Sequence, residues 1–365
     1  MPETLLVTGG AGFIGCNFVR TALSKTPARV VVVDALTYAG SLINLQDVSQ
    51  DSRYAFVRAD IADRSAMESV FRNHKPTAVV NFAAESHVDR SIDSPEIFVR
   101  TNVTGTFTLL DVARQVLRDR GKPEQAAFRF LHVSTDEVYG SLGPKDPGFR
   151  EDAAYAPNSP YAATKAAADH LVRAYHQTYG LPVLITNCSN NYGPYQFPEK
   201  LLPLMVLNAI DGRPLPVYGD GGHIRDWLYV EDHCDGILRV LQQGTPGGKY
   251  HIGGNTERTN LQLIETLCET LQRLLPAQKN PALKSRNIGH YADLKKFVED
   301  RPGHDRRYAM DASKIQSELK WKPVHAFEKG IEQTVRWYLE HAGWVKAIQS
   351  GDTQRKRLGL GGASK

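Results

Sequence analysis

Two adjacent carboxyl groups, Asp136 and Glu137, follow a strand-like segment, and Glu137 stands 24 residues ahead of Tyr161. A carboxylic acid can protonate a leaving hydroxyl, which is otherwise a poor leaving group, while a carboxylate removes a proton from a neighbouring carbon. Two carboxyl groups side by side in a partly dry site tend to separate in pKa, which leaves one protonated and the other ionised. The pair therefore predicts the elimination of water. The alternative is that both carboxyl groups simply end a strand in solvent.

Tyr161 and Lys165 are spaced by one helical turn, so both side chains emerge on one face of the predicted helix. A tyrosine with an ordinary pKa of ~10 is a poor base at neutral pH, but a nearby ammonium group and a positive nicotinamide ring both favour the phenolate. The pair therefore predicts a general base for oxidation of an alcohol by a nicotinamide cofactor. The same spacing also occurs in surface pairs, and the sequence upstream favours the catalytic interpretation.

Glycines at positions 9, 12 and 15 directly follow the first predicted strand and open a helix. Gly9 permits a tight turn, Gly12 lets the backbone approach a pyrophosphate, and Gly15 lets helix and strand pack closely. The second predicted strand ends at Asp34, 19 residues after Gly15, where a carboxylate can bind the adenosine ribose. Because this carboxylate would repel a 2′-phosphate, the sequence predicts NAD rather than NADP. The alternative is a glycine-rich turn beside a solvated Asp34.

The first half of the chain alternates short β-branched runs with amphipathic stretches, which indicates βαβ units and a doubly wound parallel sheet. The predicted strands are Leu5–Thr8, Val30–Asp34, Ala55–Arg58, Ala78–Phe82, Phe130–Ser134 and Val183–Cys188. Beyond residue 190, prolines break the pattern into short elements, which predicts a smaller α+β substrate-binding domain. The predicted Rossmann domain spans 1–188, rejoined by about 223–252 and 305–330; the substrate domain takes 189–222 and 253–304; and 351–365 is a flexible tail.

The composition fits a globular protein, with 41% hydrophobic and 23% charged residues and no apolar run long enough to span a bilayer. The N-terminus lacks the pattern of a secretory signal. Cys16, Cys188, Cys234 and Cys268 are too scattered for a zinc site or a disulfide framework, which favours free thiols in the cytoplasm. The net charge of +4 does not argue for nucleic acid. No membrane partner and no metal site are expected.

Seven segments together resemble the dTDP-glucose 4,6-dehydratases of the extended short-chain dehydrogenase/reductase family. They cover residues 5 to about 320 and read GGAGFIG, AAESHVDRSI, STDEVYG, SPYAATKAAADHLVRAY, NCSNNYGPYQFPEKLLP, GDGGHIRDWLYVEDHC and DRPGHDRRYAMD. Sugar epimerases resemble the chain in fold and in the Tyr/Lys pair but lack the two acids. The Thr135-Asp136-Glu137 triplet therefore separates the dehydratases from these sister families.

The resemblance implies conversion of dTDP-glucose to dTDP-4-keto-6-deoxy-glucose by a hydro-lyase that retains its NAD. Tyr161 takes the 4-hydroxyl proton as C4 is oxidised, and Thr135 aligns the 4-oxygen. Glu137 then removes the C5 proton while Asp136 protonates the departing 6-hydroxyl, and C6 is finally reduced. Lys165 completes the predicted catalytic set.

The resemblance also implies the residues that bind each ligand. For NAD they are Gly9, Gly12, Phe13, Ile14, Gly15, Asp34, Ala35, Leu36, Thr37, Asp60, Ile61, Phe82, Ala83, Ala84, Ser86, Thr101, Tyr161, Lys165 and Asn191. For the nucleotide sugar they are Ser86, Thr135, Glu137, Asn190, Lys200, Leu201, Pro216, Tyr218, Arg225, Asn260, Arg301 and His304, with the two arginines as phosphate clamps. His87 and His304 are expected to form hydrogen bonds rather than bind metal, because no pair of histidines has ligand spacing with a carboxylate.

A homodimer is implied as well, through helices within Ile97–Arg118 and Ala163–Tyr179. The interval between Asp136 and Tyr161 is short for the family, which predicts a trimmed loop near 143–155 that borders the active site. Two other functions stay open: a nucleotide-sugar 4-epimerase or decarboxylating relative, and a non-catalytic NAD-binding regulator. UDP-glucose remains a possible poor substrate, and the sequence does not choose between rhamnose and other deoxysugar pathways.

Overall fold

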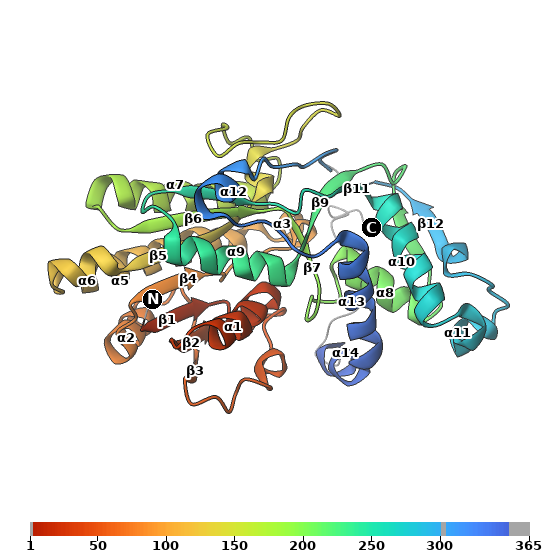
Figure 1. The fold of residues 1–365 in the computed structure, drawn as a ribbon, viewed down its shortest axis with the longest axis horizontal. Helices are drawn as coiled ribbons and strands as arrows, with labels where there is room; N and C mark the ends of the chain where they lie inside the picture. Colours follow the sequence, from red (N-terminus) through yellow and green to blue (C-terminus); the bar gives the residue numbers. More distant parts are fainter. Residues whose placement is uncertain (1–2, 301–303, 350–365) are drawn as a thin grey trace.

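A parallel seven-stranded sheet forms the centre of the computed structural model, which describes residues 3–300 and 304–349 (Figure 1). The strand order is β10-β6-β5-β4-β1-β2-β3. The strands are β1 (Thr4–Thr8), β2 (Arg29–Asp34), β3 (Tyr54–Arg58), β4 (Ala78–Asn81), β5 (Arg129–Thr135), β6 (Val183–Cys188) and β10 (Lys249–Ile252). All six predicted strands form, which confirms the predicted doubly wound α/β fold, and β10 adds a seventh beside β6. The predicted tail, 351–365, lies outside the described residues.

Helices cover both faces of this sheet and bury its inner strands, in agreement with the continuous apolar run of β2. The helices and short helical turns of this part are α1 (Phe13–Lys25), η1 (Leu42–Leu45), α2 (Arg64–His74), α3 (Val88–Asp93), α4 (Pro95–Phe98), η2 (Val99–Gly105), α5 (Thr106–Arg118), α6 (Lys122–Ala127), η3 (Asp136–Tyr139), α7 (Pro160–Tyr179), α9 (Val230–Gln243) and α12 (Ser313–Leu319). One core joins α1, α9 and α12 to the sheet, and the other joins α2, α5 and α7. The sheet is therefore a rigid base whose carboxyl ends can carry a site.

A second lobe is built around its own apolar core from short strands and four longer helices. Its elements are β7 (Asn190–Tyr192), α8 (Leu201–Ile210), β8 (Leu215–Tyr218), β9 (Ile224–Tyr229), β11 (Glu257–Thr259), α10 (Asn260–Leu274), η4 (Ala277–Lys279), α11 (Pro281–Lys284), η5 (Tyr291–Leu294), β12 (Lys295–Val298), α13 (Phe327–Glu340) and α14 (Ala342–Gln349). Strands β11, β9 and β7 form one small sheet, and β8 pairs with β12. This α+β lobe is the smaller one that the sequence predicted, while the exact ranges of the two domains remain a prediction.

The chain crosses between the lobes more than once after residue 190. Helix α9 packs against α1, and β10 joins the main sheet, whereas β9 pairs with β7 in the second lobe. Helix α10 begins with a capping box, in which Thr259 and Gln262 satisfy one another's backbone N–H groups. None of the helices in the described part of the chain is long and apolar enough to cross a membrane.

Candidate active site

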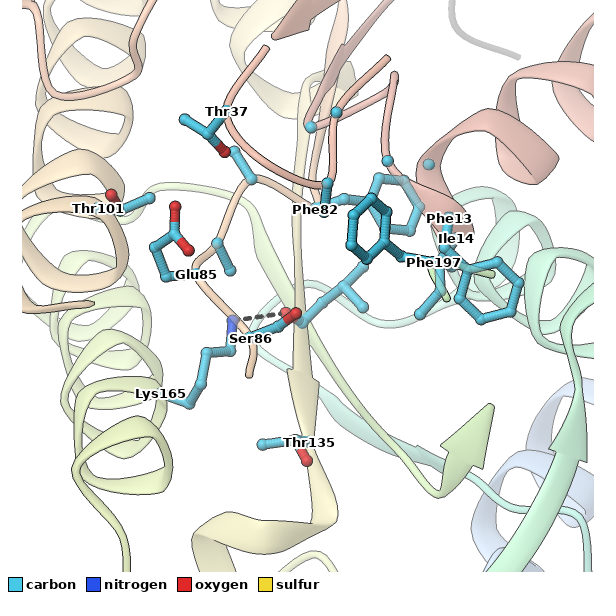
Figure 2. Close-up of a pocket in the computed structure, with 18 of the residues that line it drawn as sticks. Phe13, Ile14, Thr37, Phe82, Glu85, Ser86, Thr101, Thr135, Lys165 and Phe197 are labelled. Carbon is cyan, nitrogen blue, oxygen red and sulfur yellow. Dashed lines mark hydrogen bonds between the residues drawn. The ribbon is translucent and has the colours of Figure 1, made fainter. Parts of the chain in front are cut away.

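A cavity of about 510 Å³ runs along the carboxyl ends of the main strands and reaches the start of α8 (Figure 2). Parallel sheets bind ligands at this edge, because the loops after the strands leave a crevice there. Figure 2 shows side chains from both lobes around the cavity, including Thr135, Lys165 and Phe197. The cavity therefore brings together segments that are up to about two hundred residues apart in the sequence.

The glycine turn between β1 and α1 has the close backbone approach that the sequence predicted. Gly9 has a φ of +67°, and a Cβ there would lie 2.6 Å from the backbone nitrogen of Ala83. A Cβ on Gly15 would overlap the Gly9 carbonyl oxygen. Gly12 precedes α1 without a side-chain cap, so the first turn of the helix presents backbone N–H groups at the cavity. This cradle fits a pyrophosphate at the helix N-terminus.

Asp34 ends β2 at the edge of the same cavity. Its Oδ2 accepts a hydrogen bond from the Ala11 N–H at 2.9 Å, and its Oδ1 accepts one from the Leu36 N–H at 2.8 Å. Burial raises the pKa of Asp34, and these backbone donors oppose that rise. A carboxylate has about four lone-pair positions, so it can still accept hydrogen bonds from ribose hydroxyls. The geometry fits the adenosine end of NAD.

Nearly all of the predicted cofactor residues line the cavity; Leu36 does not, and it contributes its backbone N–H to Asp34 instead. Those in the lining are Gly9, Gly12, Phe13, Ile14, Gly15, Asp34, Ala35, Thr37, Asp60, Ile61, Phe82, Ala83, Ala84, Ser86, Thr101, Tyr161, Lys165 and Asn191. Thr101 lies in η2, a π-helical segment between the α-helices α4 and α5. The neighbouring Asn102 fixes this turn by bonding both backbone groups of Glu85.

A group of polar and aromatic residues at the cavity was not predicted from the sequence. Tyr38 lies edge-on to Phe197, with ring centroids 5.6 Å apart, and the Arg90 guanidinium lies 4.0 Å from the Tyr38 ring centroid. Arg90 also pairs with Glu199 at 3.1 Å. Tyr38, Phe197 and Glu199 line the cavity. A tyrosine shortly after Asp34 was the only local signal, and nothing in its spacing indicated the partners.

Asp136 lies just beyond the end of β5, almost fully buried beside Glu137. Its Oδ1 accepts a hydrogen bond from the Thr135 hydroxyl at 3.2 Å, and its Oδ2 has no hydrogen-bond partner within residues 3–300 and 304–349. Burial, together with the negative charge of Glu137, raises the pKa of Asp136 to about 8. The Asp136 carboxyl is therefore mostly protonated at neutral pH, as an acid beside a base must be.

Tyr161 and Lys165 lie in the first turns of α7, which begins where the Ser159 hydroxyl accepts the Ala162 N–H. The Lys165 Nζ donates to the Val133 carbonyl at 2.8 Å, and burial lowers the Lys165 pKa to about 8. Burial raises the pKa of Tyr161 well above its usual value, while a hydrogen bond with Thr135 opposes the rise. Desolvation is the largest cause of this rise, and the predicted lowering of the Tyr161 pKa by Lys165 together with a nicotinamide ring stays a prediction.

A buried polar network surrounds the lysine. The Lys165 Nζ lies 3.2 Å from His132 Nε2, and Asp169 Oδ1 lies 3.5 Å from the same ring nitrogen. Asp169 Oδ2 accepts hydrogen bonds from the hydroxyls of Ser134 at 2.9 Å and Tyr155 at 2.7 Å. The charge of Asp169 opposes the loss of the Lys165 proton, because it stabilises the ammonium form.

The predicted substrate residues fall into two groups. Ser86, Thr135, Glu137, Asn190 and Lys200 line the cavity, and Lys200 donates to the Ser86 carbonyl at 2.8 Å. Leu201, Pro216, Tyr218, Arg225, Asn260 and His304 do not line it. Arg301 lies outside the described residues. The predicted trimmed loop near 143–155 contributes no lining residue either, and packs on η3 and α7 through Phe149 and Tyr155.

Arg225, a member of the second group, lies in β9 of the other lobe. The Arg225 guanidinium donates to the Asp305 carbonyl at 2.9 Å and lies 4.3 Å from the Tyr308 ring centroid. Its positive charge favours the ionised form of Asp136 and therefore opposes the rise in the pKa of that carboxyl. The Oδ1 of Asn260 is buried without a hydrogen-bond partner in the part of the chain that the structure describes. Arg225 therefore offers a positive charge near the Asp136 carboxyl.

His304 corrects one expectation from the sequence. His223 Nε2 lies 3.1 Å from Asp300 Oδ2, and His304 Nδ1 lies 2.7 Å from Asp300 Oδ1. The two imidazoles stack with centroids 3.7 Å apart. The view that no pair of histidines lies with a carboxylate was therefore wrong, because the fold brings together residues about 80 positions apart. Nearly parallel rings do not point their lone pairs at one common point, which is unfavourable for a metal ion.

The sheet order, the glycine turn and the Tyr161/Lys165 pair define a nucleotide-binding enzyme of the extended short-chain dehydrogenase/reductase class. The model of the family described as GDP-mannose 4,6 dehydratase matches residues 6–334. The chain is 52% identical over 357 residues to dTDP-glucose 4,6-dehydratase of Neisseria meningitidis serogroup B, covering 98% of this chain and 99% of the relative. The chain belongs to the dTDP-glucose 4,6-dehydratase family.

Solved structures agree with this assignment. The dTDP-glucose 4,6-dehydratase of Streptomyces venezuelae, with NAD and dTDP bound, superposes with a TM-score of 0.84 at 46% identity, covering 94% of this chain and 99% of that one. UDP-glucose 4-epimerase of Thermotoga maritima superposes with a TM-score of 0.80 at 27% identity, covering 93% and 99%. The fold is therefore shared with epimerases, so the fold alone does not separate the two activities.

Proposed function

We propose that the protein is an NAD-dependent hydro-lyase that converts dTDP-glucose to dTDP-4-keto-6-deoxy-glucose and water. The observation that carries this proposal is the Asp136 carboxyl, raised in pKa to about 8 and holding one buried oxygen without a partner among the described residues, beside Glu137. NAD, when bound, would accept a hydride from C4 and would deliver that hydride to C6, so no cofactor is consumed. An epimerase needs no such acid.

In this proposal, Tyr161 and Thr135 both contact the 4-hydroxyl group of the sugar. The tyrosine accepts the hydroxyl proton, and the Thr135 hydroxyl aligns the oxygen. The raised Tyr161 pKa means that the phenol needs a positive charge to ionise, and a cationic nicotinamide ring and the Lys165 ammonium are the two sources. Asp169 supports this arrangement, because its charge favours the protonated form of Lys165.

Asp136 and Glu137 perform the elimination in this proposal. A ketone at C4 makes the C5 proton acidic, and the Glu137 carboxylate removes it. Asp136 donates its proton to the departing 6-hydroxyl, so that water rather than hydroxide leaves. The Thr135 hydroxyl bonds Oδ1 of Asp136, which supports the assignment of Oδ2 as the atom that faces the leaving group.

The nucleotide sugar would cross from the cavity to the Arg225 group. Asn190 and Lys200 suit the sugar end of the diphosphate, and Arg225 and Arg301 suit its phosphates through their forked donors. Tyr218 offers a ring for the thymine. Preference for thymine over uracil rests on one methyl group and is worth about 1 kcal/mol or somewhat more, so UDP-glucose is expected to be a poor substrate.

The pH dependence of kcat/KM follows from the charge states of the free protein. Asp136 must be protonated and its pKa is raised to about 8, so the rate should fall as pH rises through that value. Lys165 has its pKa lowered to about 8 and loses its ammonium charge in the same range. We therefore expect a falling limb of kcat/KM above pH of about 8, steeper than a single ionisation. A profile that stays flat to a pH of about 10, measured by product formation, would contradict both assignments.

The function is tested by incubating the purified protein with dTDP-glucose without added cofactor. We expect a product lighter by one water and no net appearance of reduced nicotinamide. A product of unchanged mass with inverted C4 would support the epimerase instead. No reaction, with or without added NAD, would leave only the fold assignment standing. NAD binding without any turnover would indicate the non-catalytic NAD-binding regulator.

A homodimer is part of this proposal. Exposed apolar side chains lie on η2, α5 and α7, where Val99, Phe107 and Tyr179 are each at least 39% exposed. These are the helices from which the sequence predicts self-association. Sedimentation equilibrium should give twice the 40.5 kDa mass of one chain, and a single-chain mass at micromolar concentration would contradict the dimer. Four free, buried cysteines support a reducing location, for which we propose the cytoplasm.

A further inference from the structure

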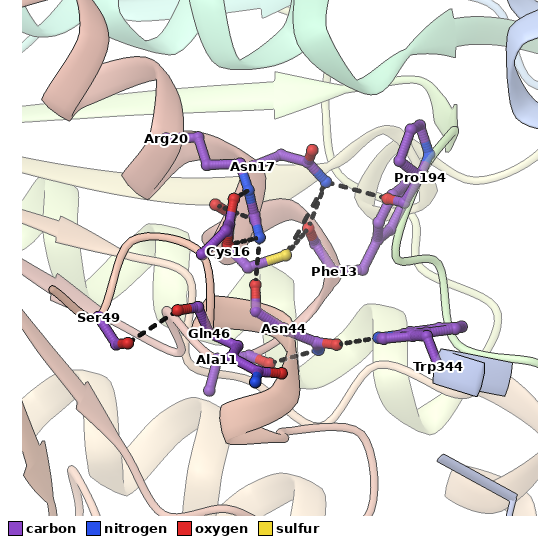
Figure 3. Close-up of polar contacts among 11 residues, drawn as sticks. Ala11, Phe13, Cys16, Asn17, Arg20, Asn44, Gln46, Ser49, Pro194 and Trp344 are labelled. Carbon is purple, nitrogen blue, oxygen red and sulfur yellow. Dashed lines mark hydrogen bonds and ion pairs between the residues drawn. The ribbon is translucent and has the colours of Figure 1, made fainter. Parts of the chain in front are cut away.

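The Asn44 side chain lies between the glycine turn and the last described helix (Figure 3). Its Nδ2 donates a hydrogen bond to the Ala11 carbonyl at 2.8 Å, and its Oδ1 accepts one from the Trp344 Nε1–H at 2.7 Å. Asn44 is 2% exposed and Trp344 is 7% exposed. Because both polar ends of one buried amide are used, loss of either partner leaves a buried group unsatisfied.

Ala11 is the residue of the glycine turn that receives this contact. Its N–H donates to Asp34 at 2.9 Å, and its carbonyl also accepts the Ser41 N–H at 3.1 Å. It lies between Gly10 and Gly12, the latter in the wall of the cavity. Glycines leave a turn free to move, so outside contacts must hold its shape. Asn44 therefore fixes the peptide that precedes Gly12 and the start of α1.

Trp344 belongs to the core of the second lobe. Its ring centroid lies 4.9 Å from that of Trp337 and 6.0 Å from that of Tyr195. Two further contacts join the lobes nearby: the Arg20 guanidinium lies 4.1 Å from the Tyr195 ring centroid, and Asn17 donates to the Pro194 carbonyl at 3.1 Å. Figure 3 shows that the Asn17 and Asn44 side chains reach Pro194 and Trp344 from the same region of the first lobe. These contacts join the second lobe to helix α1 and, through Asn44, to the glycine turn.

We propose that Ala11, Asn44 and Trp344 form a C-terminal clasp that slows the release of NAD. The clasp rests on the proposed function, because a dehydratase that regenerates NAD in every turnover must keep it bound between turnovers. Neither Asn44 nor Trp344 lines the cavity, so both are positioning residues. A turn held in its binding shape loses less conformational freedom when the pyrophosphate binds, and the bound state is correspondingly longer lived.

Trp344→Phe tests the clasp, because it removes the N–H donor and keeps an aromatic ring in the cluster. The protein is loaded with labelled NAD, an excess of unlabelled NAD is added, and the rate of label release is measured. One net hydrogen bond corresponds to a release rate roughly two- to tenfold faster. The activity that Trp344→Phe loses on dilution should return when NAD is added. Trp337→Phe is the matched control, since it makes the same change one ring away from the bond to Asn44.

Asn44→Ala breaks both bonds and should accelerate release at least as much. Because the two bonds act in series, Trp344→Phe should add nothing further in the Asn44→Ala background. Equal release rates in the wild type and Trp344→Phe would overturn the clasp, and so would an equal acceleration by Trp337→Phe. A wild-type protein that binds no NAD at all would overturn the proposed function, and the clasp with it.

Discussion

Tyr161→Phe should lower kcat by about a hundred- to ten-thousand-fold, the range expected for loss of a general base. The phenol oxygen is the atom proposed to take the 4-hydroxyl proton, and phenylalanine keeps the ring in place against Phe98, whose centroid is 6.4 Å away. Oxidation at C4 is the first step, so no reduced nicotinamide should appear in a single turnover. The measurement is rapid mixing with dTDP-glucose, followed by nicotinamide absorbance and by product mass.

Tyr250→Phe is a suitable control for this experiment. Tyr250 is also buried and also loses a hydroxyl hydrogen bond, here to Glu318 at 3.1 Å, but it does not line the cavity. The turnover of the Tyr250→Phe variant should stay within a factor of about two of the wild type, because only packing outside the site changes. A Tyr161→Phe protein that still reduces NAD at the wild-type rate would remove the tyrosine from the mechanism.

The Asp136→Asn, Glu137→Gln double variant should stop the reaction after oxidation. Both changes preserve shape, and the amide introduced in place of the Asp136 carboxyl keeps an oxygen for the Thr135 hydroxyl, but the acid and the base are gone. We expect dehydration to fall by at least about a thousand-fold, because two proton-transfer groups are lost together. Reduced nicotinamide should then accumulate on the protein, in contrast to Tyr161→Phe. Its fluorescence after mixing with dTDP-glucose is the measurement.

Asp152→Asn provides the control for the change of charge, because the Asp152 side chain is 85% exposed and lies outside the cavity wall. It should leave the time course unchanged. Asp136→Asn alone should still show exchange of the C5 proton with solvent, since Glu137 remains. Normal overall turnover in the double variant would refute the elimination roles, whatever the nicotinamide signal.

The parts of the fold and site that obey local rules could be predicted from the sequence. The run Val30–Asp34 is β-branched and apolar, so a buried parallel strand was the natural prediction, and its register places Asp34 beside the glycine turn. Tyr161 and Lys165 share one helix, and Asp136 follows one strand. In each case the functional residue lies within a few positions of the sequence pattern that predicts its element.

Contacts between distant segments could not be predicted in this way. Two groups of side chains depend on how the second lobe packs. One consists of Tyr38, Phe197 and Arg90, and the other consists of His223, Asp300 and His304. The effect of burial on the Tyr161 pKa could not be predicted for a related reason, because the cost of burying a phenolate depends on everything that surrounds it. Burial is a property of the whole fold and has no local sequence signal.

The contact between Asn44 and Trp344 spans 300 positions of the chain, which has a consequence for biosynthesis. At a usual rate of chain elongation, Trp344 leaves the ribosome about 15 to 60 s after Asn44. The nascent chain therefore contains the complete glycine turn well before the helix that supports it exists. We expect durable capture of NAD to follow the synthesis and packing of helix α14, well after the glycine turn has been made.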